Sequence, residues 1–87
     1  MGNGNKITVT VKLYSGLDRE LSFHNYNRER GIPVEIASGT RLRKILKSLG
    51  MKRIAYNAYF LNGDRIGIWK KIEEDSEISC MKPAGGG

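Results

Sequence analysis

The sequence predicts an α+β fold of two layers, in which a mixed sheet of four to five strands packs on one main helix. Apolar residues alternate with polar residues over 7–13, which is the period of a strand with one buried face. Apolar residues then recur at helical spacing over 42–49, which indicates a helix with one apolar stripe. With 87 residues the chain has the length of one small domain, and we expect residues 1–80 to form it.

The first two strands are expected to form a hairpin. After the alternating run 7–13, a second run rich in β-branched residues follows at 32–36. Pro33 restricts this run to a sheet edge or a strand start, because proline cannot donate a ladder hydrogen bond. The interval 15–31 is long for a hairpin connection, so we expect strand extensions flanking an irregular loop. His24 lies there without partner ligands at metal-like spacing, and we interpret it as a surface histidine.

The main helix is expected to begin after Ser38 and Thr40, whose hydroxyls can cap a helix, and to stop at Gly50. Its apolar stripe covers an arc of roughly 100° and is interpreted as core. The members of this stripe are Leu42, Ile45, Leu46 and Leu49. The opposite side is basic and is expected to face solvent, with Arg41, Arg43, Lys44 and Lys47.

Further strands are expected in the second half. A third strand over 54–61 ends at the turn 62–64, and a short strand with a packed Trp69 follows. The final strand covers 77–81 and buries Cys80, which we interpret as a small apolar residue and not as a nucleophile. A right-handed crossover through the helix is expected to place the third strand parallel to its sheet neighbour.

Composition narrows the possible partners and locations. The net charge of +6 fits either a nucleic acid or an acidic protein as partner. One cysteine excludes an internal disulfide and a multi-cysteine zinc site, and it permits a reducing cytoplasm. No apolar run approaches the ~20 residues of a membrane span, and the first residues lack the apolar stretch of a signal peptide. We therefore expect a cytoplasmic protein with no membrane partner, no metal and no bound cofactor.

The last seven residues, 81–87, are expected to form a flexible tail. Pro83 fixes one backbone torsion, whereas Gly85, Gly86 and Gly87 leave the chain almost unrestrained and without side chains. Fully extended, the segment would reach roughly 23 Å and could enter a narrow channel. The alternative is that these glycines are an ordinary disordered chain end.

The second half of the chain resembles the MoaD/ThiS-type sulfur carriers, and among them most the small subunit of molybdopterin synthase. The resemblance rests on Tyr-Phe-Leu-Asn-Gly-Asp at 59–64, the acidic turn and last strand at 72–80, and Pro-Ala-Gly-Gly-Gly at 83–87. It implies a ubiquitin-like β-grasp fold. Two departures concern the subfamily: the acidic turn usually reads Gly-Asp-Glu, where this chain has Asp-Ser-Glu, and Lys82 replaces a proline often found before Pro83.

The resemblance implies that Gly87 carries the sulfur. An E1-like adenylating enzyme would activate its carboxylate with ATP and Mg²⁺, and a sulfur donor would convert the adenylate to a thiocarboxylate for molybdenum or tungsten cofactor synthesis. The tail would thread into the activating enzyme or a synthase large subunit through Pro83, Ala84, Gly85 and Gly86. Arg43, Lys44 and Lys47 are candidates for steering an acidic partner. The chain shows no base, metal or nucleotide loop of its own, so we expect a carrier and not an enzyme.

Other functions remain open at this stage. A ubiquitin-like protein modifier would use the same activated carboxylate to acylate a lysine, and carriers for thiamine or tRNA thiolation share the same activation. A basic RNA-binding module is the third class, in which residues 41–53 would contact phosphates. Tyr56 and Tyr59 alternate across strand faces and make a poor stacking platform, so a nucleic acid is the less favoured partner.

Overall fold

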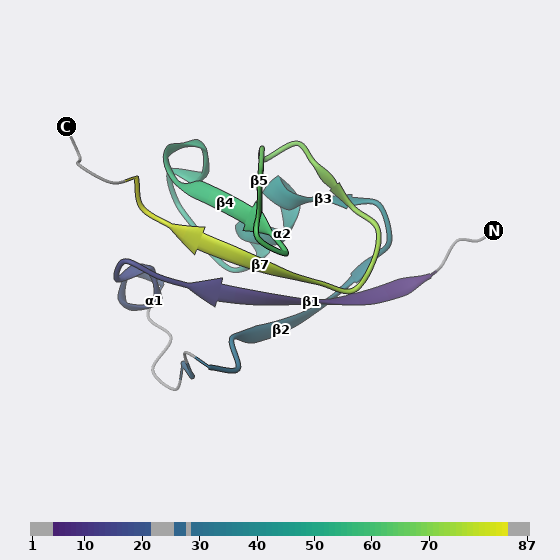
Figure 1. Cartoon of the computed structure of the whole chain (residues 1–87), viewed down its shortest axis with the longest axis horizontal. Helices are drawn as coiled ribbons and strands as arrows, with labels where there is room; N and C mark the ends of the chain where they lie inside the picture. The colour runs from purple at the N-terminus through teal and green to yellow at the C-terminus, as the bar shows by residue number, and fades with distance from the viewer. Residues whose placement is uncertain (1–4, 22–25, 28, 84–87) are drawn as a thin grey trace.

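The computed structural model describes residues 5–21, 26–27 and 29–83. Five strands form one mixed sheet in the order β2-β1-β7-β4-β5, and β3 pairs with β6 in a separate two-stranded sheet (Figure 1). The strands are β1 (Lys6–Leu13), β2 (Ile32–Ala37), β3 (Thr40–Arg41), β4 (Ala58–Leu61), β5 (Asp64–Ile66), β6 (Lys71–Ile72) and β7 (Ser76–Met81). The helices are α1 (Leu17–Glu20), α2 (Leu42–Ser48) and the 3-10 helix η1 (Ile54–Tyr56).

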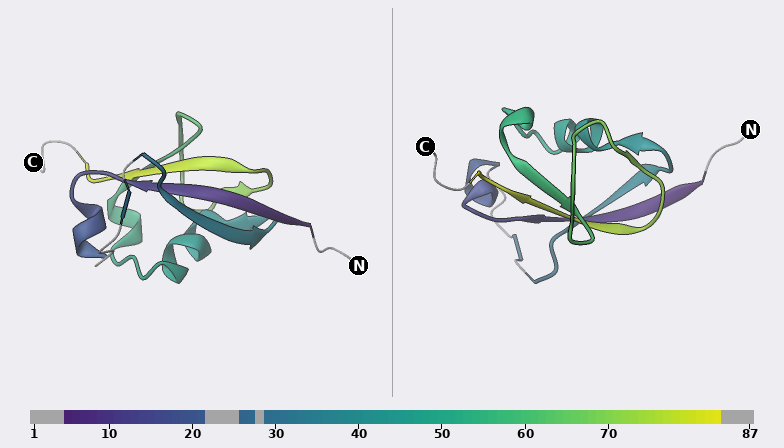
Figure 2. Two further views of the ribbon diagram at one scale, coloured as in Figure 1. Left: turned by 90° about the horizontal axis from the view of Figure 1, so that it is seen from below. Right: turned by 45° about the horizontal axis from the view of Figure 1, so that its top comes forward.

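The helices lie on one side of the five-stranded sheet, which confirms the predicted two-layer α+β class (Figure 2). Alternate residues of β1, β4 and β7 join the core, together with Leu42, Ile45 and Leu46 of the α2 stripe. The buried core consists of Val9, Val11, Leu13, Leu17, Leu42, Ile45, Leu46, Met51, Tyr59, Ile72, Ile78 and Cys80. None of the helices in the described part of the chain is long and apolar enough to cross a membrane.

The amino-terminal hairpin is confirmed. β1 pairs antiparallel with β2, which is an edge strand of the sheet. Pro33 of β2 lies opposite Thr10 of β1. Proline has no N–H to donate. At an edge strand this is tolerated, because the outer side of the strand has no neighbour in the sheet that would need the donor.

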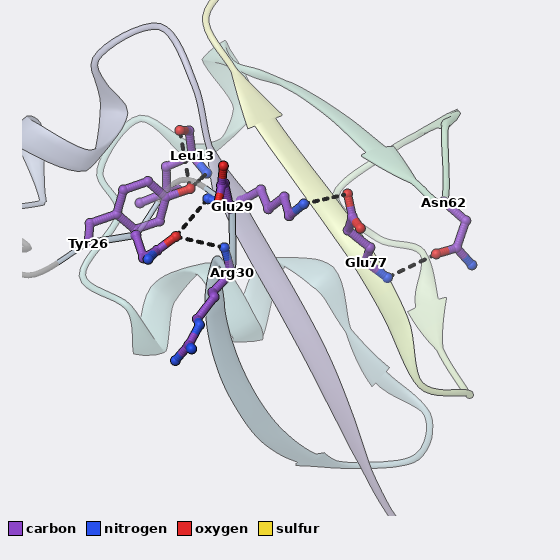
Figure 3. A network of polar contacts seen from close by, with 8 residues as sticks. Leu13, Tyr26, Glu29, Arg30, Asn62 and Glu77 are labelled. Atoms are coloured by element: carbon purple, nitrogen blue, oxygen red, sulfur yellow. Dashed lines mark hydrogen bonds and ion pairs between the residues drawn. The ribbon is translucent and has the colours of Figure 1, made fainter.

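The interval 15–31 differs from the expected strand extensions. It begins with the short helix α1, whose Leu17 is 2% exposed and joins the core. Gly16, at φ +81°, turns the chain into this helix. Tyr26 then ties the interval back to β1, because its hydroxyl accepts a hydrogen bond of 2.7 Å from the Leu13 amide (Figure 3). His24 lies outside the described residues.

The helix α2 has the predicted apolar stripe and the predicted stop, but its start differs. Ser38 donates its hydroxyl proton to the Glu73 carbonyl and Thr40 donates to the Ala37 carbonyl, so neither caps the helix. Backbone carbonyls of the segment 67–70 instead accept from the first amides of the helix, at 2.9 Å from Leu42 to Lys70 and 2.8 Å from Arg43 to Ile68.

The end of α2 is a Schellman motif. Gly50, at φ +86°, donates to the Lys47 carbonyl, and Met51 donates to the Leu46 carbonyl. The left-handed conformation explains why glycine stands at this position.

The sequence predicted one strand over 54–61, but the structure contains a helix and a shorter strand there. Arg53 has φ +53° and turns the chain into η1, and only residues 58–61 form β4. The turn after β4 is confirmed: Asn62 and Gly63 have φ of +49° and +94°, which is typical of a type I′ hairpin to β5. Asn62 also accepts from the Glu77 amide at 2.9 Å through Oδ1, as Figure 3 shows.

The prediction of a packed Trp69 in a short strand is wrong. Trp69 lies in a turn and not in a strand, and 61% of its surface is exposed. The charged segment that follows contains β6, which pairs with β3. Both features arise from contacts with the residues just before and within α2, which are far away in the sequence.

The parallel strand pair also differs from the prediction. β4 has β7 and β5 as neighbours and is antiparallel to both, whereas the parallel pair is β1 and β7. The last strand enters the sheet between β1 and β4, so the crossover through α2 does not bring β4 next to β2. A salt bridge of 3.7 Å between Lys12 and Glu77 joins the parallel pair on its open face.

Candidate functional site at the root of the C-terminal tail

The tail leaves the molecule from the middle of the sheet. β7 lies between β1 and β4, where the Tyr14 amide donates to the Cys80 carbonyl at 2.9 Å and Met81 pairs with Ala58. The strand continues to Met81, one residue into the expected tail, and Lys82 and Pro83 are exposed. The tail residues Ala84, Gly85, Gly86 and Gly87 lie outside the described residues. The described strand that precedes them is hydrogen-bonded to a neighbour on each side.

A hollow of about 360 Å³ lies beside this exit. We call it the tail-root hollow; it is lined by Lys52, Arg53, Tyr56, Asn57 and Lys82. Tyr56 is 62% exposed, which is unusual for a large aromatic residue. The described lining contains three cationic side chains and no carboxylate, so the surface around the root of the tail is basic.

A buried tyrosine holds the wall of the tail-root hollow in place. Tyr59 on β4 is 1% exposed, and its hydroxyl donates to the Ile54 carbonyl of η1 at 2.6 Å. The Asn57 side-chain amide lies 3.5 Å from the same hydroxyl. Burial raises the pKa of Tyr59, an effect that the hydrogen bond from Asn57 opposes and the nearby Cys80 thiol reinforces. The phenol therefore stays protonated at neutral pH and remains a donor to η1.

Cys80 has the buried, inert character that the sequence predicted. Its side chain is fully buried, and burial raises the pKa of the thiol to about 12. Because the thiolate is the nucleophilic form, this cysteine is not a reactive group at neutral pH.

The basic face of α2 does not line the tail-root hollow. Lys44 and Lys47 are exposed and Arg43 is half-buried, with its guanidinium carbon 5.4 Å from the centre of the Trp69 ring. Arg43 and Lys44 line a second hollow with Trp69. Sequence reasoning had placed Lys52 and Arg53 in the same basic stretch as these residues, but the turn at Gly50 separates the two groups. The glycine at position 50, already predicted to end the helix, was the available sequence signal for that separation.

Metal ligands do not gather in the described residues, where no group of three His, Cys, Asp or Glu side chains could hold an ion.

Comparisons with known proteins give matches in structure but not in sequence. No protein-family model matches the chain, and a search of curated proteins finds no match. A Pyrococcus furiosus protein provisionally described as molybdopterin converting factor, subunit 1, matches with a TM-score of 0.68 and 13% identity, covering 90% of this chain and 99% of that chain.

Two further solved structures are similar. The HVO 2177 protein of Haloferax volcanii matches with a TM-score of 0.72 and 12% identity over 100% of this chain and 92% of that chain. Small archaeal modifier protein 1 of Methanosarcina acetivorans matches with a TM-score of 0.62 and 18% identity over 97% and 100%. Identities this low establish a shared fold and not a shared function. The chain therefore has the ubiquitin-like β-grasp fold that its resemblance to the MoaD/ThiS-type carriers predicted.

Proposed function

We propose that this chain is a ubiquitin-like sulfur carrier whose C-terminal glycine, Gly87, is activated and then loaded with sulfur. The observation that carries the proposal is the position of the tail. A glycine-rich segment follows directly on a central strand that is hydrogen-bonded on both sides, and the root of that segment is exposed. A rigid body that presents a thin, side-chain-free end suits delivery of a terminal carboxylate into another protein's active site. The matches to a molybdopterin converting factor subunit and a small archaeal modifier protein support the same reading.

The proposed chemistry has two steps. A carboxylate is a poor electrophile, so an E1-like enzyme with ATP and Mg²⁺ first activates it: a Gly87 carboxylate oxygen attacks the α-phosphorus, and pyrophosphate leaves. Sulfur at the oxidation level of sulfide then attacks the acyl carbon, and AMP leaves with the bonding electrons. The product is a thiocarboxylate. The chain contributes the reacting carboxylate and its presentation, and the partners contribute the catalysts.

The use of the sulfur is the finer part of the proposal. We favour donation of the sulfur in molybdopterin biosynthesis, for the molybdenum or tungsten cofactor, in a complex with a synthase large subunit. This choice rests on the sequence resemblance to the synthase small subunit and on the structural match to a molybdopterin converting factor subunit.

A second candidate is a protein modifier, favoured by the match to small archaeal modifier protein 1. In that role a lysine amine would attack the activated Gly87 and form an isopeptide bond. The two functions share the adenylate and differ in the nucleophile that attacks it. In the carrier the nucleophile is sulfur, and in the modifier it is a lysine amine.

The proposal is tested with the chain, ATP, Mg²⁺, a cognate activating enzyme and a sulfide donor. The parent is expected to gain the mass of one oxygen-to-sulfur exchange, located in the C-terminal peptide. Deletion of Gly86 and Gly87 and the substitution Gly86→Val are both expected to abolish this gain without lowering the melting temperature. Gly67→Val is the matched control, because a Cβ at Gly67 meets nothing within 4 Å and the residue lies outside the segment 81–87.

Normal loading of the shortened chain would end the carrier proposal. The proposal also requires that Gly87 ends the mature chain, which intact mass of the protein isolated from its source measures. Detection of Gly87 joined to lysine in place of the thiocarboxylate would select the modifier.

A further inference from the structure

A second hollow, of about 430 Å³, lies where the turn 38–40 and the start of α2 meet the turn that follows β5. We call it the Trp69 hollow, since its wall is formed by Trp69, Arg41, Arg43, Lys44 and the residues of the turn 38–40. The described residues that line it include three cations and no carboxylate. It is not part of the tail-root hollow, with which it shares no lining residue.

Two guanidinium groups hold the tryptophan. Arg43 lies over the indole with its guanidinium carbon 5.4 Å from the ring centre, and Arg41 Nη1 donates to the Trp69 carbonyl at 2.8 Å. Even so, 61% of the Trp69 surface is exposed. The contacts therefore fix the orientation of the ring without covering it, and they leave a large apolar surface in water.

The rest of the hollow is held by backbone hydrogen bonds. The Leu42 and Arg43 amides donate to carbonyls at Lys70 and Ile68, on either side of Trp69. The Gly39 amide donates to the Ile72 carbonyl at 2.8 Å. A partner that binds here would meet a surface already in its bound shape, which lowers the entropic cost of association.

Tryptophan and arginine are the residues most often found at the energetic centre of protein interfaces. Guanidinium groups also match the geometry of carboxylates, with which they form charge-assisted hydrogen bonds. We infer that the Trp69 hollow is a docking site for a short acidic segment of a partner protein, in which an apolar side chain covers the indole and flanking carboxylates pair with Arg43 and Lys44. This inference does not depend on the chemistry of the tail.

An extended nucleic acid fits the surroundings less well. The Ser38 hydroxyl donates to the Glu73 carbonyl at 3.0 Å, so the acidic residues Glu73, Glu74 and Asp75 begin at the rim of the hollow. A long polyanion would pass these carboxylates, whereas a short acidic segment can end before them. Trp69 is also the one large aromatic residue that the described lining contributes, so successive bases would find no continuous platform.

The test uses a five-residue acetylated peptide with one central leucine flanked on each side by Asp and Glu. Trp69 is the single tryptophan of the chain, so its fluorescence reports binding to the full-length protein without a label. We expect a saturable change in the fluorescence of Trp69 that weakens with added salt. Replacing the leucine of the peptide by glycine, or its acids by their amides, is expected to weaken binding about tenfold.

Variants locate the site when binding is followed by the anisotropy of a labelled peptide. Trp69→Ala and Arg43→Ala are each expected to weaken binding by about tenfold. Arg65→Ala is the matched control, since Arg65 makes the other cation–π contact in the described part of the chain. Its guanidinium carbon lies 5.9 Å from the centre of the Phe60 ring, on the strand pair β4 and β5 and outside the Trp69 hollow. It is expected to change affinity by less than about twofold. Equal circular dichroism spectra and melting temperatures establish that the variants are folded.

Two results would overturn the inference. One is the absence of saturable, Trp69-dependent binding up to millimolar peptide. The other is Trp69-dependent binding of single-stranded oligouridylate or oligoadenylate that is tighter than that of the peptide at physiological salt, which would assign the hollow to a nucleic acid.

Discussion

At the scale of single residues, the clearest consequence of burial concerns Cys80. Its thiol lies between the sheet and the helices with no exposed surface, and its pKa is raised to about 12 from an ordinary value of 9.0. The folded state favours the protonated thiol more strongly than the unfolded state does. Burial of the protonated thiol therefore costs no stability as long as the unfolded thiol is protonated too. The part of the stability that depends on this proton is complete below about pH 9 and is lost as the pH rises toward 12.

This shift predicts a pH dependence of stability. Between pH 7 and pH 10 the parent is expected to lose about 1.4 kcal/mol of unfolding free energy through Cys80, because the unfolded thiol ionises and the folded thiol does not. Cys80→Ala is expected to lose correspondingly less over the same range. Urea unfolding at a series of pH values measures both slopes. A parent and a variant with identical slopes would show that the thiol is not buried as the structure has it.

At the scale of elements, local signals identified some segments and missed others. The alternation of β1, the stripe of α2 and the Asn62-Gly63 turn were predicted correctly because each depends on residues adjacent in the chain. The start of α2 was not, because the partners of its first amides lie on the segment 67–70. The same long-range contact places Trp69 in an exposed turn, and no periodicity in the sequence reports it.

A buried hydroxyl, that of Tyr59, ties the short helix η1 to the sheet. Tyr59→Phe removes the donor to the Ile54 carbonyl and is expected to destabilise the protein by roughly 1 to 2 kcal/mol. Tyr56→Phe is the matched control, since that side chain is 62% exposed and surface changes typically cost within about 0.5 kcal/mol. Hydrogen exchange of the amides at 56 and 57 is expected to quicken in Tyr59→Phe. Equal stability of the two variants would contradict the role given to Tyr59.

At the scale of the whole molecule, the two hollows lie toward opposite ends of the sheet. The turn 38–40 follows Ala37, which pairs with Lys6 at the start of β1, whereas the tail follows β7, whose Cys80 pairs with Leu13 at the end of β1. Seven residues of strand separate these positions by about 23 Å. In Figure 1, β3 lies to the right of the end of β7. Apart from Lys82, the basic residues of both hollows come from the single stretch 41–53, and only the tertiary fold divides them between the two ends.

This division predicts that equal charge changes at the two ends have different effects on the tail. Lys52→Glu and Lys44→Glu each lower the formal net charge from +6 to +4, so they alter the overall field of the protein equally. If the carrier proposal holds, the activating enzyme meets the tail-root hollow and not the Trp69 hollow. Lys52→Glu is then expected to raise the KM for activation by roughly threefold to tenfold and to reduce its dependence on salt, because charges at the rim of an interface act mainly on association. Lys44→Glu is expected to leave the KM within about twofold of the parent.

Pyrophosphate exchange catalysed by the activating enzyme at a series of salt concentrations measures both constants. If the two variants were equally impaired, the overall charge would steer the encounter and the tail-root hollow would have no role of its own.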